Sequence, residues 1–391
     1  MNRRDFLKLI PVGISAYWLG GCSSIDEVVK DAIEEGIIEL GPLHAETLAS
    51  GLDTPWEIAW GPDDAIWVTE RKGTISRVNP TDGQVTLVGQ VDVVEVSESG
   101  LMGMAFHPDF SAQPFVYVVH SYSAPGGIRN RLVRLRYDGI GLSNADVLLD
   151  NIPGAGNHNG SRIVIGSDRF LYMTTGDAQN SALAQQRDSL AGKVLRLTLD
   201  GQPAPGNPFG TAIYSYGHRN PQGLVFHPDT NDLYITEHGP ADNDEVNRVE
   251  IGQNYGWPNV RGFCDDDVRG EADFCKTNNV VEPVAVWTPT IAPSGADFYN
   301  ADLIPGWKGS FLFTTLKGAS LVRLTLSGDG SRASSEAFLF RGEFGRLRDV
   351  LVGPNGEVYL ATSNRDGRGR PAANDDRILR IQPELIGKNE A

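Results

Sequence analysis

Cysteine, methionine and basic residues are scarce in this chain. Its 391 residues include three cysteines and four methionines, and 34 Lys and Arg stand against 50 Asp and Glu, a formal net charge of −16. A chain this acidic is not expected to bind nucleic acid, whose phosphates attract positive charge. No second Cys or His pair stands near Cys264 and Cys275 to complete a zinc site with them.

Long amphipathic helical patterns are also nearly absent, which argues against an α-helical fold. The chain has 45 Gly, 23 Pro and six copies of one phrase: a short apolar run, a turn, and a second apolar run containing Tyr or Trp. Five copies are followed by a further alternating strand. The pattern predicts an all-β fold, a six-bladed β-propeller of four-stranded antiparallel sheets. The turns fall at Gly61, His107, Gly166, His227, Asn300 and Gly353, spaced by 46, 59, 61, 73 and 53 residues.

The N-terminus carries the features of an export signal. Arg3 and Arg4 precede an apolar stretch that ends in small residues and Cys22. The paired arginines predict the twin-arginine route, and Cys22 predicts lipid acylation after cleavage. A membrane-spanning anchor is the alternative, but the apolar stretch is short and contains glycine.

These features predict four segments: a signal peptide at 1–21, an acylated Cys22 with an acidic stalk at 22–43, a catalytic propeller at 44–385 and a tail at 386–391. We therefore expect an exported protein on the periplasmic face, held to a membrane by its lipid alone. Ser23 and Ser24 lack the aspartate often linked with inner-membrane retention, which favours the outer membrane.

The remaining two cysteines are eleven residues apart in an Asp-rich, loop-like segment. In an exported protein, Cys264 and Cys275 are expected to form one local disulfide. A metal-binding pair or two free thiols are the alternatives.

Five residues that are cationic or can become so come from different repeats. Loops at one end of a propeller converge on the central channel, so together these residues would form an anion site. Two of them, Arg346 and Arg348, are expected to share one face of a strand, with Leu347 and Asp349 on the other. Paired guanidinium groups suit a polycarboxylate, whereas an isolated arginine would more simply be a solvated rim residue. The five are His158, Arg219, Lys317, Arg346 and Arg348.

His158 is the candidate general base. Its neighbours Asn157, Asn159 and Gly160 leave room for a substrate, and histidine titrates near neutrality. Asp177 could orient the imidazole and stabilise its charged form. From the chemistry alone, a structural histidine explains the pattern equally well.

An oxygen-rich segment follows, in which Asp242, Asp244 and Glu245 form a loop beside Gly239 and Pro240. Calcium takes six to eight oxygen ligands, including backbone carbonyls. The spacing is not that of an EF-hand, so a solvated acidic loop is an equal alternative.

Several of these segments resemble one known family. The stretches GLMGMAFHPDF, GKVLRLTLDG, GHRNPQG, NYGWPNV and GRLRDV are similar to those of soluble PQQ-dependent glucose dehydrogenases and aldose sugar dehydrogenases. The likeness to this glucose/sorbosone dehydrogenase family covers residues 46 to 383. It implies a six-bladed propeller that oxidises a sugar hemiacetal to a lactone with pyrroloquinoline quinone (PQQ) and calcium.

The resemblance also implies residue roles. His158 matches the base, Asp177 its partner, and Arg219 and Asn220 match residues at the quinone end of the cofactor. The other positions implied to bind the cofactor are Glu98, His238, Asp244, Thr290, Lys317, Arg346 and Arg348. The carbonyls of Gly239 and Pro240 match those of a catalytic calcium site, and Glu245, Asp265 and the Tyr255 carbonyl resemble a structural one.

Departures from the family pattern concern the substrate. Glu98 and His238 stand where the glucose dehydrogenases have glutamines, Asn157 replaces an aspartate, Ala285 replaces a tyrosine, and Trp287 is one place away from the expected tryptophan. Glucose is therefore not assumed, and the electron acceptor is expected to be a quinone or a cytochrome. A calcium-dependent hydrolase such as a lactonase, or a non-catalytic ligand-binding propeller, is the competing interpretation.

Overall fold

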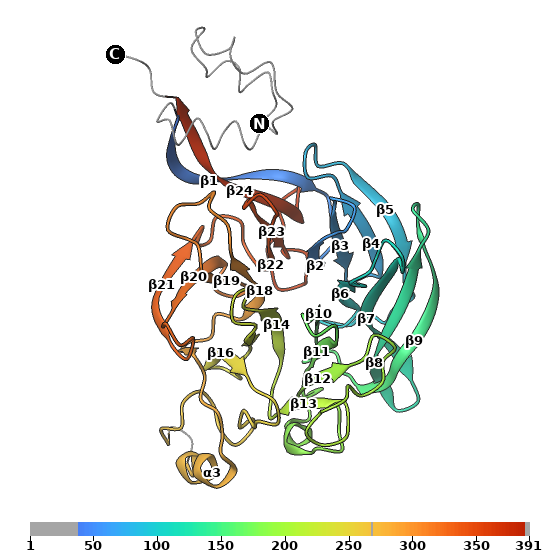
Figure 1. Cartoon of the computed structure of the whole chain (residues 1–391), viewed down its shortest axis with the longest axis vertical. Helices are drawn as coiled ribbons and strands as arrows, with labels where there is room; N and C mark the ends of the chain where they lie inside the picture. The colour runs from blue at the N-terminus through green and yellow to red at the C-terminus, as the bar shows by residue number, and fades with distance from the viewer. Residues whose placement is uncertain (1–37, 267–268, 388–391) are drawn as a thin grey trace.

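The computed structural model describes residues 38–266 and 269–387, which form six four-stranded antiparallel sheets in a ring (Figure 1). The first strand of each sheet packs against the first strands of both neighbours, and the last of them, β22, returns to β2. The predicted six-bladed propeller is therefore confirmed. The first strands are β2 (Pro55–Trp60), β6 (Leu101–Phe106), β10 (Gly160–Ile165), β14 (Pro221–Phe226), β18 (Pro293–Tyr299) and β22 (Leu347–Val352).

Each of the first five blades is built from four consecutive strands. Blade 1 continues with β3 (Ile66–Glu70), β4 (Thr74–Val78) and β5 (Val85–Gln90), and blade 2 with β7 (Phe115–Ala124), β8 (Gly127–Tyr137) and β9 (Leu142–Pro153). Blade 3 adds β11 (Leu171–Thr175), β12 (Lys193–Leu197) and β13 (Ile213–Tyr216). Blade 4 adds β15 (Leu233–Glu237), β16 (Asp244–Val249) and β17 (Ala285–Trp287). Blade 5 adds β19 (Ser310–Thr315), β20 (Ser320–Leu326) and β21 (Ala333–Leu339).

The sixth blade joins the two ends of the described chain. It contains β22, β23 (Val358–Thr362), β24 (Arg377–Gly387) and, as its outermost strand, β1 (Ile38–Ser50). β1 pairs with β24 from Ile38 opposite Gly387 to Ser50 opposite Arg377. Strand structure thus begins inside the segment expected to be a stalk and extends past residue 385. The predicted signal peptide, Cys22, most of the predicted stalk and most of the predicted tail lie outside the described residues.

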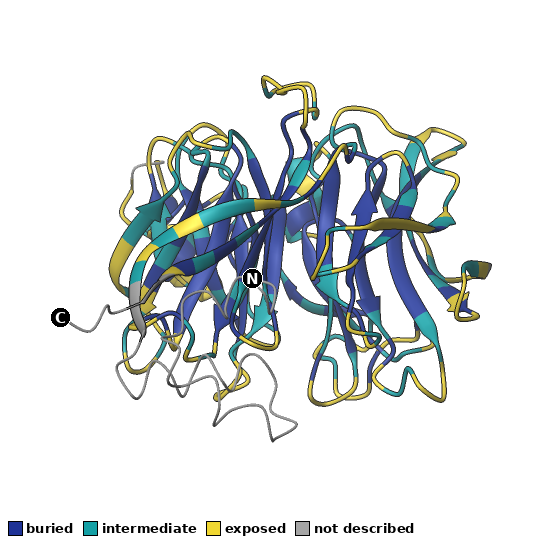
Figure 2. Cartoon of the chain, turned by 90° about the horizontal axis from the view of Figure 1, so that it is seen from above, coloured by how far each residue is buried: buried dark blue, intermediate teal, exposed yellow. Residues whose placement is uncertain are grey.

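The apolar core lies between neighbouring sheets. Between blades 6 and 1, for example, Tyr359 and Ile378 pack with Ile58 and Val68. Because blades cover both faces of each sheet, middle strands such as β3 and β23 are buried along their whole length. Figure 2 shows these buried strands inside the ring and the exposed loops at its two ends.

One strand differs from the sequence prediction, which assigns Asp244 and Glu245 to a loop. In the structure β16 begins at Asp244 and pairs with β15, with Glu245 opposite Glu237. Burial explains the strand, because Val246 and Val249 pack into the core while the polar residues occupy the strand start. The acidic residues are therefore held on a rigid element.

Helices are few in the described part of the chain: a 3₁₀ turn, η1 (Ser181–Gln185), and α3 (Glu271–Asn278). Neither has the length and apolar character needed to cross a membrane.

Ring closure predicts a stability difference between two positions of β1. Ala49 is buried against the core of blades 6 and 1, whereas Thr47 is exposed on the same strand. Ala49→Asp should lower the free energy of unfolding by about 3 kcal/mol or more, because the carboxylate would be buried without a partner. Thr47→Asp should change it by less than about 0.5 kcal/mol. Urea unfolding monitored by tryptophan fluorescence measures both, and equal effects would contradict docking of β1 by this face.

Candidate active site

The candidate catalytic residues and most of the candidate cofactor-binding residues lie at one end of the ring. In an antiparallel blade, the link between the second and third strands and the link to the next blade fall at the same end, because neighbouring strands reverse direction. His158, Arg219 and Arg346 lie in links between blades, and Asp177 and Lys317 lie in links between second and third strands. The topology alone therefore brings residues from distant repeats to one surface.

A cavity of about 240 Å³ opens at this end. The structure brings together there several residues that the sequence analysis assigns to different roles. Three further lining residues are Asn157, Ala292 and Arg368. The assigned residues in the lining are Glu98, His158, Arg219, His238, Gly239, Pro240, Asp244 and Thr290.

His158 is held by a buried carboxylate. Its Nδ1 lies 2.8 Å from Asp177 Oδ1, and the Asp177 side chain is 2% exposed. The His158 backbone is left-handed (φ 61°), and a side chain at Gly176 would meet the His158 carbonyl oxygen at 2.0 Å. Gly176 thus lets the His158 loop pack directly against the end of β11. The imidazole edge that carries Nε2 is left for a ligand.

The Trp257 side chain contacts both Asp177 and Arg219. Its Nε1 donates a hydrogen bond of 2.9 Å to Asp177 Oδ2, and the Arg219 guanidinium lies 5.2 Å from its ring centroid. Sequence reasoning did not assign Trp257 a role, although it lies in the NYGWPNV stretch. Indole N–H donors usually find a partner when buried, and this one stabilises the negative charge of Asp177.

Four buried nitrogens of the site have no hydrogen-bond partner in the described structure: Arg219 Nε, Asn220 Nδ2, His238 Nε2 and Arg348 Nε. Buried donors without acceptors are costly, so they suit a ligand rich in carbonyl and carboxylate oxygens. Burial lowers the pKa of Arg219 despite the nearby Asp177 and Glu237 carboxylates. Burial also lowers the pKa of His238 to about 3, so this imidazole is neutral at pH 7.

Glu98 is paired across the cavity mouth with Arg368, which the sequence analysis missed. Arg368 Nη1 donates to Glu98 Oε1, and its Nη2 donates to Asn157 Oδ1 at 3.2 Å. Burial alone would raise the pKa of Glu98, but electrostatic interaction with His238, the hydrogen bond and charge of Arg368 and the charge of Arg348 lower it. In the sequence Arg368 lies in a Gly-rich loop and is indistinguishable from a solvated arginine.

The other cations lie to one side of the cavity or beneath it. Lys317 Nζ donates to Thr290 Oγ1 at 2.6 Å, and Arg346 pairs with Asp366 at 2.7 Å. Arg348 is buried and donates to Gln222 Oε1 at 2.7 Å. Burial lowers its pKa to about 10. These cations adjoin the cavity but do not all line it.

The expected alternation of side-chain faces at residues 346–349 is wrong for Leu347 and Asp349. The register of β22 with β23 shifts between Leu347 and Asp349, as in a β-bulge. Leu347 therefore packs in an apolar cluster, whereas Asp349 Oδ2 forms an ion pair with Arg162 Nη1 at 2.9 Å. The two residues do not share an environment.

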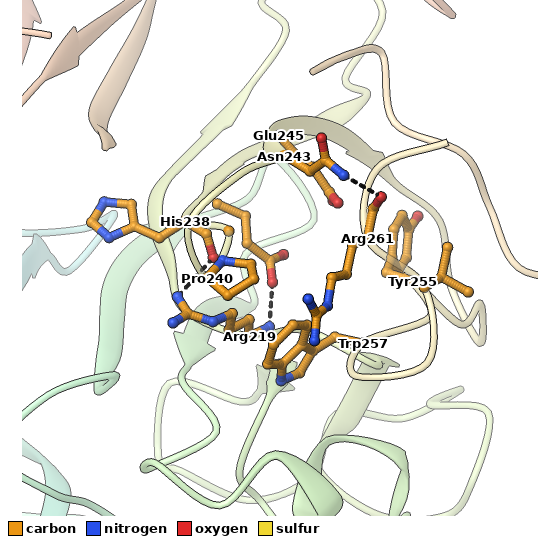
Figure 3. Close-up of a pocket in the computed structure, with 11 residues that line it drawn as sticks. Arg219, His238, Pro240, Asn243, Glu245, Tyr255, Trp257 and Arg261 are labelled. Atoms are coloured by element: carbon orange, nitrogen blue, oxygen red, sulfur yellow. Dashed lines mark hydrogen bonds between the residues drawn. The ribbon is translucent and has the colours of Figure 1, made fainter. Parts of the chain in front are cut away.

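A second, smaller cavity lies beside Arg219, and Figure 3 shows its lining. Glu237, Glu245 and Tyr255 line it, together with Gly239 and Pro240. Burial and the Glu237 charge raise the pKa of Glu245. Among residues 38–266 and 269–387, no group of three or more His, Cys, Asp or Glu side chains is arranged to hold a metal ion.

The proposed structural calcium set is only partly assembled in this second cavity. Two carboxylates buried side by side, with backbone oxygens nearby, suit a cation. Asp265 is exposed and is not part of the lining, so it does not join Glu245 and Tyr255 there.

The structure also locates the predicted disulfide and two positions at which the sequence departs from the glucose dehydrogenases. Cys264 and Cys275 are joined by a disulfide that ties the segment after β16 to α3. Trp287 Nε1 donates to Glu336 Oε2 at 2.9 Å, and neither Trp287 nor Ala285 lines the 240 Å³ cavity. These two positions therefore do not shape that cavity directly.

The left-handed backbone of His158 gives a stability prediction. A residue with a β-carbon pays about 1 kcal/mol in this conformation and glycine does not, so His158→Gly should be more stable than His158→Ala by about that amount. At His227, whose φ is not positive, the order of the Gly and Ala variants should reverse. Chemical unfolding of the four variants measures both differences. The same order at both positions would contradict a strained His158.

Comparisons with known proteins identify the family of the chain. A family model described as Glucose / Sorbosone dehydrogenase matches residues 52–379. The chain is 32% identical over 409 residues to Quinoprotein glucose dehydrogenase B of Acinetobacter calcoaceticus, covering 82% of this chain and 85% of that protein. It is 31% identical over 344 residues to Aldose sugar dehydrogenase YliI of Escherichia coli K12, covering 83% and 91%.

Among solved structures, the chain is similar to the PQQ-bound form of an aldose sugar dehydrogenase from Streptomyces coelicolor. The two share 38% sequence identity with a TM-score of 0.76, and the match covers 88% of this chain and 99% of the other. The apo-form of the soluble aldose sugar dehydrogenase from Escherichia coli matches with a TM-score of 0.77 at 29% identity, covering 88% and 100%.

Proposed function

The chain belongs to the Glucose / Sorbosone dehydrogenase family, and we propose that it is a PQQ- and calcium-dependent dehydrogenase that oxidises aldose sugars to lactones. The observation that carries this proposal is the His158 imidazole, which Asp177 holds beside a cavity whose unpaired donors suit an acceptor-rich cofactor. A hydrolase would have no use for those donors together with Lys317 and Arg346.

His158 is the proton acceptor in this proposal. Its Nδ1–H donates to Asp177, which leaves Nε2 as the basic nitrogen facing the cavity. The sugar hydroxyl proton passes to Nε2. The hydrogen on the same carbon leaves with both electrons of its C–H bond, and the C–O bond becomes the lactone carbonyl. Trp257 and the Gln179 amide also donate to Asp177, which fixes its position beside the imidazole so that the carboxylate can stabilise the imidazolium.

The cofactor is PQQ, which when bound supplies the two-electron acceptor for the hydrogen on the sugar carbon. Arg219 and Asn220 would hold its quinone end, since each has a buried nitrogen without a partner. Lys317, Arg346, Arg348 and Thr290 would hold its carboxylates. Their cationic and hydroxyl donors match carboxylate oxygens in charge and hydrogen-bonding type.

Calcium would be held by the carbonyls of Gly239 and Pro240, and a second ion by Glu245 and the Tyr255 carbonyl. The neighbouring Glu237 and Glu245 carboxylates support a cation there, because burial and the Glu237 charge raise the pKa of Glu245 even though Asn247 and the Gly262 amide donate to it. The first ion would act as a Lewis acid beside the cofactor.

We further propose that the protein is exported as a lipoprotein and passes electrons to a quinone or a cytochrome. The support is the N-terminal pattern of paired arginines and Cys22, and the disulfide between Cys264 and Cys275 fits an oxidising compartment.

Reconstitution tests the reaction. Purified protein supplied with PQQ and calcium should reduce an artificial dye when aldoses are added, and it should not do so with PQQ omitted or calcium chelated. Product analysis should find lactone. Absence of dye reduction with every aldose, alcohol and aldehyde offered, or hydrolysis of lactones instead, would contradict the proposal.

Different mutations should affect proton removal and cofactor binding. His158→Gln should lower kcat by about 10²- to 10⁴-fold, because a general base is lost, while PQQ affinity measured by absorbance titration stays the same. The double variant Lys317→Gln and Arg346→Gln should instead weaken PQQ binding by about tenfold or more, through lost charge-assisted hydrogen bonds. Loss of PQQ from the His158 variant would show that the residue holds the cofactor.

A further inference from the structure

One buried amide connects two residues that the proposed function assigns to different ends of the cofactor. Gln222 Oε1 accepts a hydrogen bond of 2.7 Å from Arg348 Nη1, and Gln222 Nε2 donates to Asn220 Oδ1 at 3.1 Å. The Gln222 side chain is buried, and both of its polar atoms have partners. Asn220 Nδ2 and Arg348 Nε, in contrast, have none among the described residues. Gln222 is therefore placed to act on a ligand through these two neighbours.

The repeat of the propeller brings the neighbours of Gln222 together near the axis of the ring. Gln222 is the second residue of β14, the first strand of blade 4. The same position is occupied by Trp56 in blade 1, Ser294 in blade 5 and Arg348 in blade 6. In each of these strands the pairing register shifts at this position, as in a β-bulge, which can re-aim a side chain.

Contacts between these equivalent positions hold the Arg348 side chain. Its Nη1 also donates to Ser294 Oγ at 3.3 Å, and its guanidinium lies 5.8 Å from the Trp56 ring centroid. With the bond to Gln222, Arg348 is thus contacted from three other blades. The position of its guanidinium depends on the closed ring and on these polar partners.

The direction of the hydrogen bonds is fixed at Arg348. A guanidinium has donors only, so the atom of Gln222 that faces it must be the amide oxygen. The amide nitrogen of Gln222 then faces Asn220, whose oxygen must accept. The Gly160 backbone amide donates to the same Asn220 oxygen at 3.1 Å. Asn220 is therefore oriented with its Nδ2 left to donate to an acceptor on a ligand.

The positive charge of Arg348 is held in place by neutral partners. Arg348 forms no ion pair with a described residue, and Gln222 contributes only an uncharged oxygen. The nearby Arg162 is different, since it pairs with Glu57 at 2.8 Å and with Asp349 at 2.9 Å. The charge of Arg162 is thus compensated inside the protein, whereas that of Arg348 is left for an anion.

We propose that Gln222 is a positioning residue for the cofactor, because its one amide orients Asn220 toward a carbonyl acceptor and Arg348 toward a carboxylate. This inference rests on the proposed function. Only a neutral amide does both, since one end accepts and the other donates. A glutamate could accept from Arg348 but could not donate to Asn220, and a methionine could do neither.

The test is PQQ affinity, measured by absorbance titration of the full chain with calcium present. Gln222→Met should weaken PQQ binding about tenfold, because Asn220 and Arg348 are no longer held in the binding orientation. Gln222→Glu should weaken it about 100-fold or more, since the new carboxylate would also neutralise Arg348 and repel the carboxylates of the cofactor.

A double-mutant cycle separates positioning from direct contact. If Gln222 acts through its neighbours, Gln222→Met should have a smaller effect in the Asn220→Ala background and in the Arg348→Met background than in the unaltered chain. The same roughly tenfold effect in both backgrounds would mean that Gln222 acts independently of them, and it would overturn the positioning role.

Asn207→Leu is the matched control. Asn207 is a half-buried amide between β12 and β13, at the opposite end of the ring, and it donates two hydrogen bonds, to Arg196 O at 2.9 Å and to Thr211 O at 2.7 Å. Its loss should lower the melting temperature and leave PQQ affinity unchanged. Gln222→Asn, which keeps both amide atoms on a shorter side chain, should give an intermediate loss of affinity. It replaces the methionine variant if that one does not fold.

The proposed function and the role of Gln222 can fail separately. An unaltered chain that binds PQQ, with equal affinity in folded Gln222→Met or Gln222→Asn variants, would overturn the role of Gln222 and leave the proposed function standing. An unaltered chain that does not bind PQQ would overturn both. Weaker binding in the Gln222 variants, reduced in the two mutant backgrounds and absent from the Asn207 variant, supports the inference.

Discussion

The pairing of β1 with β24 is the constraint on which the rest of the structure depends. It joins residues 38–50 to residues 377–387 in one sheet and so closes six blades into a ring. Only in a closed ring does blade 6 lie beside blade 1, so that Arg368 in a blade 6 loop reaches Glu98 and Asn157 in the links after blades 1 and 2. The mouth of the cavity is therefore a product of ring closure as much as of any local sequence.

Within that mouth, the chemistry depends on buried polar groups that are only partly satisfied. Asp177 accepts hydrogen bonds from Trp257 and the Gln179 amide as well as contacting His158, so its carboxylate is held in place beside the imidazole. Nearby, Arg219 and His238 keep nitrogens without partners in the described structure. A protein that buries such donors gives up stability which a bound, acceptor-rich ligand can restore. The site is thus organised for a cofactor before one arrives.

Much of the fold could be predicted because it repeats. Six copies of one hairpin phrase predict six blades, and five alternating segments after them predict five third strands. β1 could not be found this way, since Ile38–Ser50 carries no copy of the phrase and its partner strand is at the other end of the chain. The start of β16 was not predicted because Asp244 and Glu245 have the composition of a loop. The bulge after Leu347 was not predicted because nothing in the local sequence interrupts the alternation of side chains.

The candidate site was predictable where residues are unusual for their surroundings, as with His158 between two asparagines. It was not predictable for Trp257 or Arg368, whose positions depend on partners far away in sequence. Since blade 6 takes strands from both ends of the described chain, the ring stays open until the ribosome has finished residues 377–387. A chain terminated before these residues would leave the mouth incomplete, so the cavity can assemble only after β24 has been synthesised.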